Sequence, residues 1–382
     1  MQIGFYFSPL RIALNPTGVG RHTTCMISKL AGSEGVSGVL LANRHSYANI
    51  ASRLPSGLAQ MPTTLLPGRE RLMRFLLQYT RLLPIDRFNN KLDWIYCPKE
   101  QPIYTKQARL AVTVHDVVSL ENNIPGMPKP SFLKRKRWKA TVVQLLARAD
   151  LILSVSQFTK ERILQLFDIP DEKKIIVVGN GVSEQFFRDK GSEDHTVLER
   201  YNLDNRSYVL AIGGLSARKG GDTIVKLAQA IKRSNLDTEI IVAGTTHTPK
   251  NIAAVEELAS FGNPLPIRLL GYVHDHDLSV LLSNSLAFLF PSLYEGFGIP
   301  ALEAMAAGTP VISSNTTSLP EVVGDAGIVV EPTAISEMLS AITEFARNDQ
   351  TRQEYIEIGR KRVTKYTWNQ CASRALNALK TY

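Results

Sequence analysis

Short apolar runs rich in valine, isoleucine and leucine alternate with longer helix-like segments along the whole chain, and this alternation restricts the fold more than any other feature. Some runs, such as LILSV at 151–155, are apolar on both faces, which is typical of strands that helices cover on both sides. The alternation predicts an α/β protein whose parallel sheets are joined by right-handed crossovers. The expected strands are Gln2–Phe7, Val36–Leu41, Trp94–Cys97, Leu110–His115, Leu151–Val155, Lys174–Val178, Tyr208–Gly213, Glu239–Ala243, Ile267–Leu270, Ala287–Phe290 and Pro310–Ser313.

The alternation stops in a polar, charged stretch between Val182 and Tyr208 and then starts again. A chain of 382 residues is long enough for two domains. We therefore predict a first doubly wound domain over 1–190 and a second from 191 onward, facing each other across a cleft. Ligands of such sheets bind at the carboxyl ends of the strands.

Composition limits the setting and the partners. No apolar stretch is long enough for a transmembrane helix, and the first residues lack the basic and apolar regions of a signal peptide. Three scattered cysteines, Cys25, Cys97 and Cys371, favour a reducing compartment, so a cytoplasmic protein is expected. The net charge of +9 favours an anionic partner, which leaves nucleic acid, a membrane surface or a phosphorylated substrate.

The segment 291–321, PSLYEGFGIPALEAMAAGTPVISSNTTSLPE, carries the richest chemistry. A strand runs into a loop with Glu295, Gly296 and Gly298, and Pro300 then opens a helix. The glycines allow close backbone approach, and the new helix presents free N–H groups that suit a phosphate. Glu303 follows at spacing E-x7-E, so one carboxylate could accept hydrogen bonds from sugar hydroxyls and the other from a ribose.

This segment resembles the retaining glycosyltransferase family 4, whose fold is called GT-B, and the resemblance covers nearly the whole chain. It implies two Rossmann-like domains and transfer of a sugar from a nucleotide diphosphate donor with its α configuration kept. It also implies that no metal or other cofactor is needed. Glu295 is assigned to catalysis, and the donor-binding residues of this segment are Gly296, Phe297, Gly298, Ile299 and Glu303.

Two further segments resemble the donor side of the family. The strand YVLAIGG leads into LSARKG, where Arg218 and Lys219 would neutralise the two phosphates and stabilise the departing diphosphate. Many relatives have arginine where this chain has Gly214. We assign Gly214 to donor binding and the guanidinium role to Arg218. The segment LGYV contributes Val273, in a stretch whose backbone reads the base edge.

The amino-terminal half resembles the acceptor side of the family. After the first strand, Gly18 and Gly20 open a helix and allow close backbone approach to the donor phosphate. His115 ends the strand LAVTVH, at the place where the family's histidine lines the reaction centre and touches the donor sugar; Asp116 is expected to orient the loop. Thr367-Trp368 is expected to anchor a helix over about 366–382 that returns to the first domain, which limits the second domain to 191–365.

The segment His274–Asp277, HDHD, has two interpretations. Carboxylates and imidazoles are both metal ligands. The same residues also suit a helix N-terminus with Asp275 as its cap, and we favour the helix start.

Positive charge gathers in two places. Arg69, Arg71, Arg74 and Arg81 lie among apolar residues, and FLKRKRWK at 132–139 combines five basic residues with Phe132 and Trp138. Such clusters suit a peripheral position on an anionic membrane, although a solvated basic face has the same composition. Nucleic acid is disfavoured, because no nucleic-acid-binding motif accompanies the charge.

The sequence leaves more than one candidate for the donor and for the acceptor. LSARKG and the E-x7-E segment resemble mannosyltransferases of O-antigen and exopolysaccharide pathways, so GDP-mannose comes first and UDP-glucose or another UDP-sugar second. The expected acceptor is a glycan, such as one linked to polyprenyl diphosphate. Two rivals are an epimerase or phosphorylase on the same fold and a non-catalytic glycan-binding or scaffold subunit.

Overall fold

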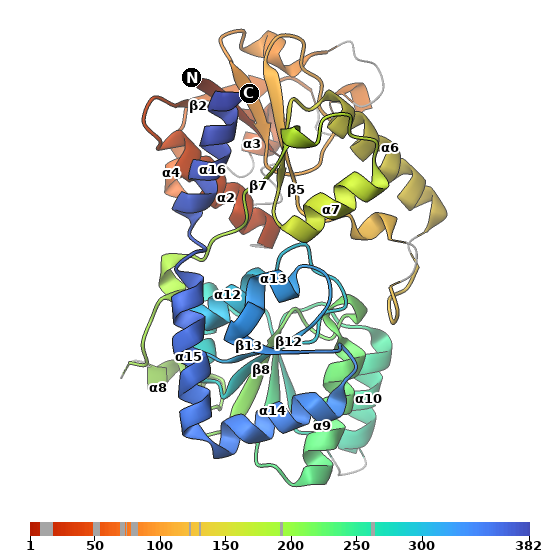
Figure 1. Ribbon diagram of the computed structural model, residues 1–382, viewed down its shortest axis with the longest axis vertical. Helices are drawn as coiled ribbons and strands as arrows, with labels where there is room; N and C mark the ends of the chain where they lie inside the picture. The colour runs from red at the N-terminus through yellow and green to blue at the C-terminus, as the bar shows by residue number, and fades with distance from the viewer. Residues whose placement is uncertain are drawn as a thin grey trace. The chain divides into compact units, whose positions relative to one another are not determined.

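The structure, a computed structural model, describes residues 1–7, 18–48, 54–68, 73, 75–77, 83–121, 124–129, 131–191, 194–260 and 264–382 (Figure 1). The chain forms two compact units. Unit 1 comprises Met1–Glu121, Pro130–Gly181 and Trp368–Tyr382, and unit 2 comprises Asn122–Lys129 and Val182–Thr367. The sequence placed the division after residue 190, whereas the chain passes into unit 2 after Gly181. The polar stretch that marked the division in the sequence belongs to unit 2.

Unit 1 is built on a seven-stranded parallel sheet in the order β3-β2-β1-β4-β5-β6-β7. Strand β1 lies between β2 and β4, so the strand order reverses there, which is where open α/β sheets bind ligands. The strands are β1 (Gln2–Tyr6), β2 (Ser37–Asn43), β3 (Thr63–Leu66), β4 (Trp94–Cys97), β5 (Arg109–Val114), β6 (Leu151–Ser154) and β7 (Ile175–Val177).

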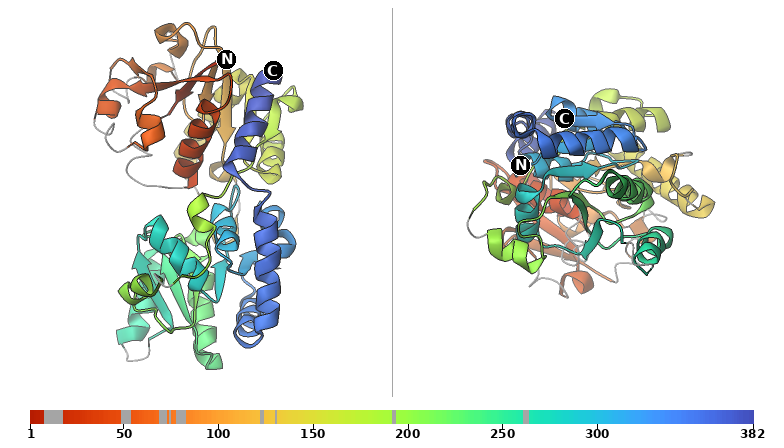
Figure 2. Two further views of the ribbon diagram at one scale, coloured as in Figure 1. Left: turned by 90° about the vertical axis from the view of Figure 1, so that its left-hand side faces the viewer. Right: turned by 90° about the horizontal axis from the view of Figure 1, so that it is seen from below.

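Helices flank this sheet. The last helix, α16, packs against α2, and the two run side by side in Figures 1 and 2. The return of the chain to unit 1 thus begins at Trp368, within the range expected from the sequence. The helices and short turns of the unit are α2 (Gly18–Ala31), α3 (Arg44–Ala48), α4 (Ser56–Ala59), η2 (Ile85–Phe88), η3 (Val118–Leu120), α6 (Phe132–Arg148), α7 (Gln157–Leu166), η4 (Glu172–Lys174) and α16 (Trp368–Thr381).

Unit 2 is built on a six-stranded parallel sheet in the order β10-β9-β8-β11-β12-β13. Here the order reverses at β8, which pairs with both β9 and β11. The carboxyl ends of β8 and β11 therefore open next to each other. The strands are β8 (Tyr208–Ile212), β9 (Glu239–Ala243), β10 (Ile267–Gly271), β11 (Ala287–Phe290), β12 (Val311–Ser314) and β13 (Gly327–Val330).

The helices of unit 2 cover its sheet, and α15 packs against both α12 and α14. The buried core is formed mainly by valine, leucine and isoleucine from the strands and from the inner faces of α9 and α14. The elements are η5 (Glu184–Phe186), α8 (Asp194–Arg200), η6 (Ala217–Lys219), α9 (Gly221–Ser234), α10 (Pro249–Ser260), α11 (Asp275–Asn284), α12 (Ile299–Ala306), α13 (Leu319–Val323), η7 (Gly324–Ala326), α14 (Ile335–Arg347) and α15 (Asp349–Val363).

The predicted α/β architecture with two parallel sheets is confirmed. Every expected strand is present, with its ends shifted by two residues at most. The sequence did not predict β3 and β13, which each bury only one of their four residues and so lack the fully buried run seen in β4 and β11. Within the described residues, no helix is long and apolar enough to cross a bilayer.

Candidate active site

Two loops far apart in sequence meet at the carboxyl edge of the sheet of unit 2. One contains η6 and follows β8; the other runs from Pro291 to Gly298 and follows β11. The Leu293 N–H donates to the carbonyl of Arg218 at 2.8 Å, so the two backbones are joined directly. Gly220 has φ +74, and a Cβ there would lie 2.1 Å from the Pro291 carbonyl oxygen. Only glycine fits so close an approach.

This junction brings two cations onto one carboxylate. Lys219 Nζ lies 2.7 Å from Glu295 Oε1, and Arg218 Nη1 lies 3.1 Å from Glu295 Oε2. The side chains of Lys219 and Glu295 are only 13% and 10% exposed, while that of Arg218 is 37% exposed. Lys219 Nζ also stands 4.8 Å from the centroid of the Phe290 ring. The cluster thus combines one nearly buried ion pair with a guanidinium that reaches solvent.

The positive charges of Lys219 and Arg218 keep the Glu295 carboxylate ionised. Burial alone would raise the pKa of Glu295, but the positive charges of Lys219 and Arg218 outweigh burial and hold that pKa below its ordinary value. Glu295 is therefore ionised near neutral pH. Burial lowers the pKa of Lys219, and the Glu295 carboxylate opposes this shift. With Lys219 charged, two cations and one carboxylate give a net positive charge that favours an anion such as a diphosphate.

A third loop, between β12 and α13, fixes the backbone around Glu295. Ser318 Oγ donates to the carbonyl oxygens of Glu295 at 2.9 Å and Phe297 at 2.8 Å. The Glu295 N–H donates to Thr317 Oγ1 at 3.0 Å, and Thr317 itself has φ +57, a conformation that is rare outside glycine. Sequence reasoning missed both hydroxyl residues, because their partners are distant along the chain.

Two of the predicted donor-binding glycines, Gly214 and Gly298, lie where a Cβ would come close to another residue. Gly214 has φ +70, and a Cβ there would lie 2.2 Å from the carbonyl oxygen of Thr246. Gly298, with φ +114, occupies the N-cap position of α12, and a Cβ there would lie 2.7 Å from Leu319 Cδ2. Gly214 therefore has no room for a side chain, and the positive φ of Gly298 is a conformation that favours glycine.

The remaining predicted residues of unit 2 are mostly buried. Gly296 precedes Phe297, whose ring is 6% exposed and stands 6.0 Å from the ring of Tyr366, so Phe297 is a packing residue here. Ile299 is the first residue of α12, and Glu303, 2% exposed, lies further along it. Val273 is 6% exposed just after β10.

In unit 1, His115 follows β5 directly and is 8% exposed. Its Nε2 lies 2.8 Å from the carbonyl oxygen of Pro98, so this nitrogen carries the proton, and its backbone N–H donates to Glu100 Oε1 at 2.6 Å. Burial lowers the pKa of His115 to about 4. The ring is therefore neutral near pH 7, and Nδ1, which has no hydrogen bond to any described residue, is an acceptor.

The surroundings of His115 include expected and missed residues. Asp116 Oδ1 accepts from the Val118 N–H at 3.1 Å, which is the loop-orienting contact that the sequence predicted. Gly18 is the first residue of α2, and Gly20 is buried in its first turn. Glu100, whose pKa is raised by burial, was not singled out in the sequence. A glutamate after a Cys-Pro-Lys turn carries no local signal for such a contact.

The HDHD segment begins a helix, as favoured, but its predicted cap is wrong. Helix α11 starts at Asp275, and the N-cap residue is His274, whose side chain makes no capping bond. Asp277 Oδ2 instead pairs with Arg200 Nη1 at 2.7 Å and accepts from the Tyr201 hydroxyl at 3.0 Å. Among the described residues, no group of three histidine, cysteine or acidic side chains is arranged to hold a metal ion.

Of the two basic clusters predicted from the sequence, the structure describes the second but not the first. Arg69, Arg71, Arg74 and Arg81 lie outside the described residues. The second cluster begins α6, where Phe132 is 73% and Leu133 69% exposed.

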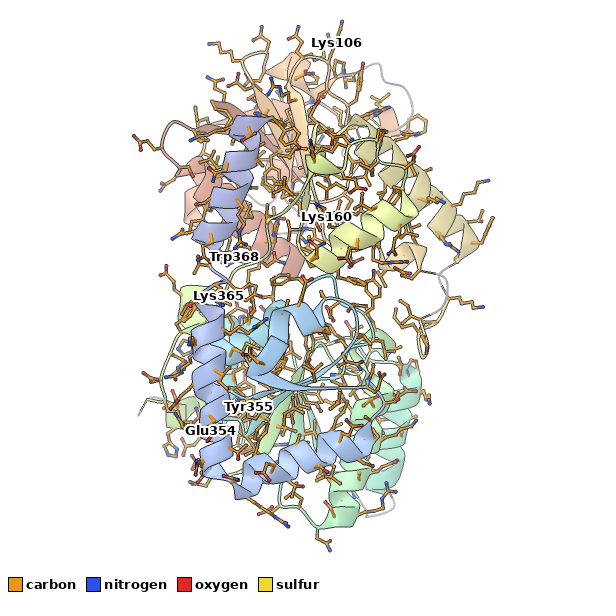
Figure 3. All side chains as sticks on the ribbon, in the orientation of Figure 1. Lys106, Lys160, Glu354, Tyr355, Lys365 and Trp368 are labelled. Carbon is orange, nitrogen blue, oxygen red and sulfur yellow. The ribbon has the colours of Figure 1, made fainter. Side chains whose placement is uncertain are left out.

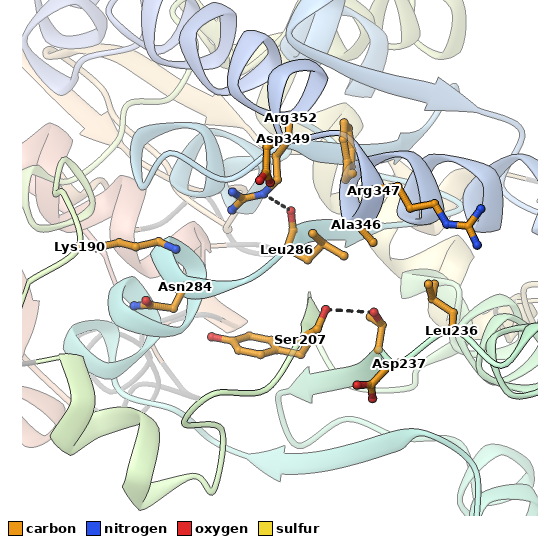
Figure 4. Close-up of a pocket in the computed structure, with 13 residues that line it drawn as sticks. Lys190, Ser207, Leu236, Asp237, Asn284, Leu286, Ala346, Arg347, Asp349 and Arg352 are labelled. Atoms are coloured by element: carbon orange, nitrogen blue, oxygen red, sulfur yellow. Dashed lines mark hydrogen bonds between the residues drawn. The ribbon is translucent and has the colours of Figure 1, made fainter.

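A hollow of about 450 Å³ lies at the opposite edge of the sheet of unit 2 (Figure 4). Tyr208 and Leu286, at the beginnings of β8 and β11, line it together with Lys190 and Arg352. This is the amino edge of the strands, away from the Arg218–Lys219–Glu295 cluster, so we do not assign it to the donor.

In the comparison with known proteins, each half of the chain matches a family model. The family model described as Glycosyltransferase Family 4 matches residues 16–186, and the model described as Glycosyl transferases group 1 matches residues 196–362. The "O-antigen chain mannosyltransferase B" of Escherichia coli is 29% identical over the full length of both chains. The "Serotype-specific mannosyltransferase WbdA" of E. coli is 26% identical over 69% of this chain and 32% of that protein. Anabaena Alr3699/HepE, solved in complex with UDP-glucose, superposes with a TM-score of 0.72 at 15% identity over the full length of both chains.

Two parallel Rossmann-like sheets, with a cationic cluster at the carboxyl edge of the second, define a glycosyltransferase of the GT-B fold. Both halves of the chain match glycosyltransferase models, the first of them that of family 4, and the protein is a glycosyltransferase.

Proposed function

We propose that this glycosyltransferase moves mannose from GDP-mannose to a glycan acceptor, with retention and without a metal ion. The Arg218–Lys219–Glu295 cluster carries the proposal, because it provides two cations and a carboxylate at the edge where phosphates bind. Mannose is favoured because two similar proteins are named mannosyltransferases. We further propose an acceptor linked to polyprenyl diphosphate in bacterial O-antigen synthesis.

Each group has a role that follows from its chemistry. Arg218 and Lys219 stabilise the negative charge that develops on the departing diphosphate, the task that a divalent cation performs in metal-dependent transferases. Glu295 is ionised and accepts hydrogen bonds from sugar hydroxyls. Glu303, on α12, is proposed to accept a hydrogen bond from the ribose.

His115 is proposed to orient the sugar. Because its ring is neutral and Nε2 already donates to Pro98, Nδ1 is left to accept a hydrogen bond from a sugar hydroxyl. A pKa of about 4 makes His115 too weak a base to take the acceptor's proton near pH 7. We propose that the leaving phosphate takes this proton as the acceptor attacks from the same face.

A thermal-shift panel tests the donor. Because a ligand that binds only the folded state raises the Tm, we expect GDP-mannose to raise the Tm more than UDP-glucose or ADP-glucose, equally with and without EDTA. The matched control is Lys219→Ala/Glu295→Gln, which lacks two of the three charges of the cluster and should show little shift. A shift with UDP-glucose alone would favour the UDP-sugar alternative; HepE, of the same fold, was solved with that ligand. No shift with any nucleotide sugar would favour a non-catalytic scaffold.

We also propose that the start of α6 contacts an anionic membrane surface. Exposed Phe132 and Leu133 stand beside Lys136 and Arg137 at its first turns, so an apolar anchor is adjacent to positive charge. At low salt, we expect more protein to sediment with anionic than with neutral vesicles, and Phe132→Ser/Leu133→Ser to reduce that fraction. Equal recovery with both vesicle types would overturn this proposal.

A further inference from the structure

We infer that His22, on α2, is a positioning residue that fixes the ring of His115 for transfer. The inference rests on the proposed role of His115 in orienting the sugar. His22 is completely buried, and its ring centroid lies 4.6 Å from that of His115 with an interplanar angle of 86°. This edge-to-face contact restricts how far the His115 ring can turn about its Pro98 hydrogen bond.

His22 is itself held by both ring nitrogens. Nδ1 lies 2.6 Å from Asn180 Oδ1, and Nε2 lies 3.2 Å from the Tyr96 hydroxyl oxygen. The Tyr96 hydroxyl also lies 2.7 Å from Thr113 Oγ1. One arrangement satisfies all three contacts: Thr113 donates to Tyr96, Tyr96 donates to Nε2, and Nδ1–H donates to Asn180. A ring with both nitrogens occupied cannot flip without breaking buried hydrogen bonds.

The network also requires both imidazoles to be neutral. Burial, and then the neighbouring His115, lower the pKa of His22 well below its ordinary value. Since His115 is likewise neutral near pH 7, no charge is buried between the two rings. His115 therefore keeps Nε2 protonated and Nδ1 as its acceptor.

Two partners of His22 stand where the chain passes between the units. Asn180 lies just before the passage from Gly181 to Val182, and Trp368, labelled in Figure 3 at the start of α16, follows the passage from Thr367. The Trp368 ring centroid is 5.9 Å from that of His22. His22 thus contacts Tyr96 of β4, the segment that ends at Gly181, the start of α16 and the ring of His115.

The test compares His22→Phe with His22→Gln, using transfer from GDP-mannose as the assay. Phenylalanine keeps a planar ring but loses both hydrogen bonds, whereas glutamine can still donate to Asn180 and accept from Tyr96. We expect His22→Phe to lower kcat about 10- to 100-fold, with little change in the donor KM, since a small misplacement of a group that orients the substrate costs that much. His22→Gln should retain more of the wild-type kcat. Tyr96→Phe should show an intermediate loss if His22→Phe proves too unstable to purify.

A double-mutant cycle separates positioning from general damage. In the His115→Ala background, we expect His22→Phe to lower kcat no further, because its effect passes through His115. The same fold-loss in both backgrounds would overturn the inference. His115→Ala with wild-type kcat would instead refute the proposed role of His115, and a wild-type protein without GDP-mannose transfer would refute the proposed donor.

Discussion

Replacing Lys219 by alanine is expected to lower kcat for transfer about 100- to 1,000-fold, the loss seen when one preorganised charge-stabilising donor is removed. Lys219 Nζ lies 2.7 Å from Glu295 Oε1 at the carboxyl edge of the sheet, so it is fixed before the diphosphate develops charge. The donor KM should change less than kcat, because the leaving group carries more negative charge in the transition state than in the bound donor. Steady-state kinetics with GDP-mannose give both values.

The stability of this variant must be measured together with its activity. Lys219→Ala leaves the nearly buried Glu295 with Arg218 alone, and an under-compensated buried carboxylate destabilises a protein. The matched control is Lys219→Ala/Glu295→Gln, in which the carboxylate is neutral. We expect it to regain stability in urea unfolding but to stay inactive. A folded Lys219→Ala protein with wild-type kcat would contradict the assignment.

Gly214→Ala is expected to lower the free energy of unfolding strongly, and Gly271→Ala is its matched control. Gly214 and Gly271 both have φ +70 in unit 2, so alanine suffers the same backbone penalty at each. At Gly214 the new Cβ would lie 2.2 Å from the Thr246 carbonyl oxygen, whereas at Gly271 nothing lies within 4 Å. We expect a loss of about 1 kcal/mol in the free energy of unfolding for Gly271→Ala and about 3 kcal/mol for Gly214→Ala.

Urea unfolding of the two variants measures the difference directly. The additional loss at Gly214 reports the contact between the loop after β8 and the segment after β9. If both substitutions cost the same, the two backbones are not in contact, and the close packing of this edge is wrong.

The strands and the motif segments could be predicted from the sequence, because a local pattern of residues determines them. Buried parallel strands are continuous apolar runs, so the ends of β4 and β11 could be read directly. The E-x7-E segment and LSARKG were found because their residue types are close together in sequence. Their meeting followed from topology, since neighbouring strands β8 and β11 present their loops at the same edge.

The residues that were missed act through distant partners. Thr317 and Ser318 hold the Glu295 loop from another strand connection, and His22 contacts Tyr96, Asn180 and Trp368, which are far from it in sequence. No local period or motif reports such contacts. The cap at Asp275 was misplaced for a related reason: the helix begins one residue earlier than a capping aspartate requires, and the next acidic residue, Asp277, is paired with Arg200.

Calorimetric titration of GDP-mannose and GMP into wild type and into Arg218→Ala/Lys219→Ala/Glu295→Gln tests the central claim most directly. We predict that the triple variant binds GDP-mannose at least about 100-fold more weakly, the energy of a few charge-assisted hydrogen bonds, while GMP, which lacks the sugar-bearing phosphate, is affected far less. A folded triple variant that binds GDP-mannose with the wild-type Kd would contradict the account.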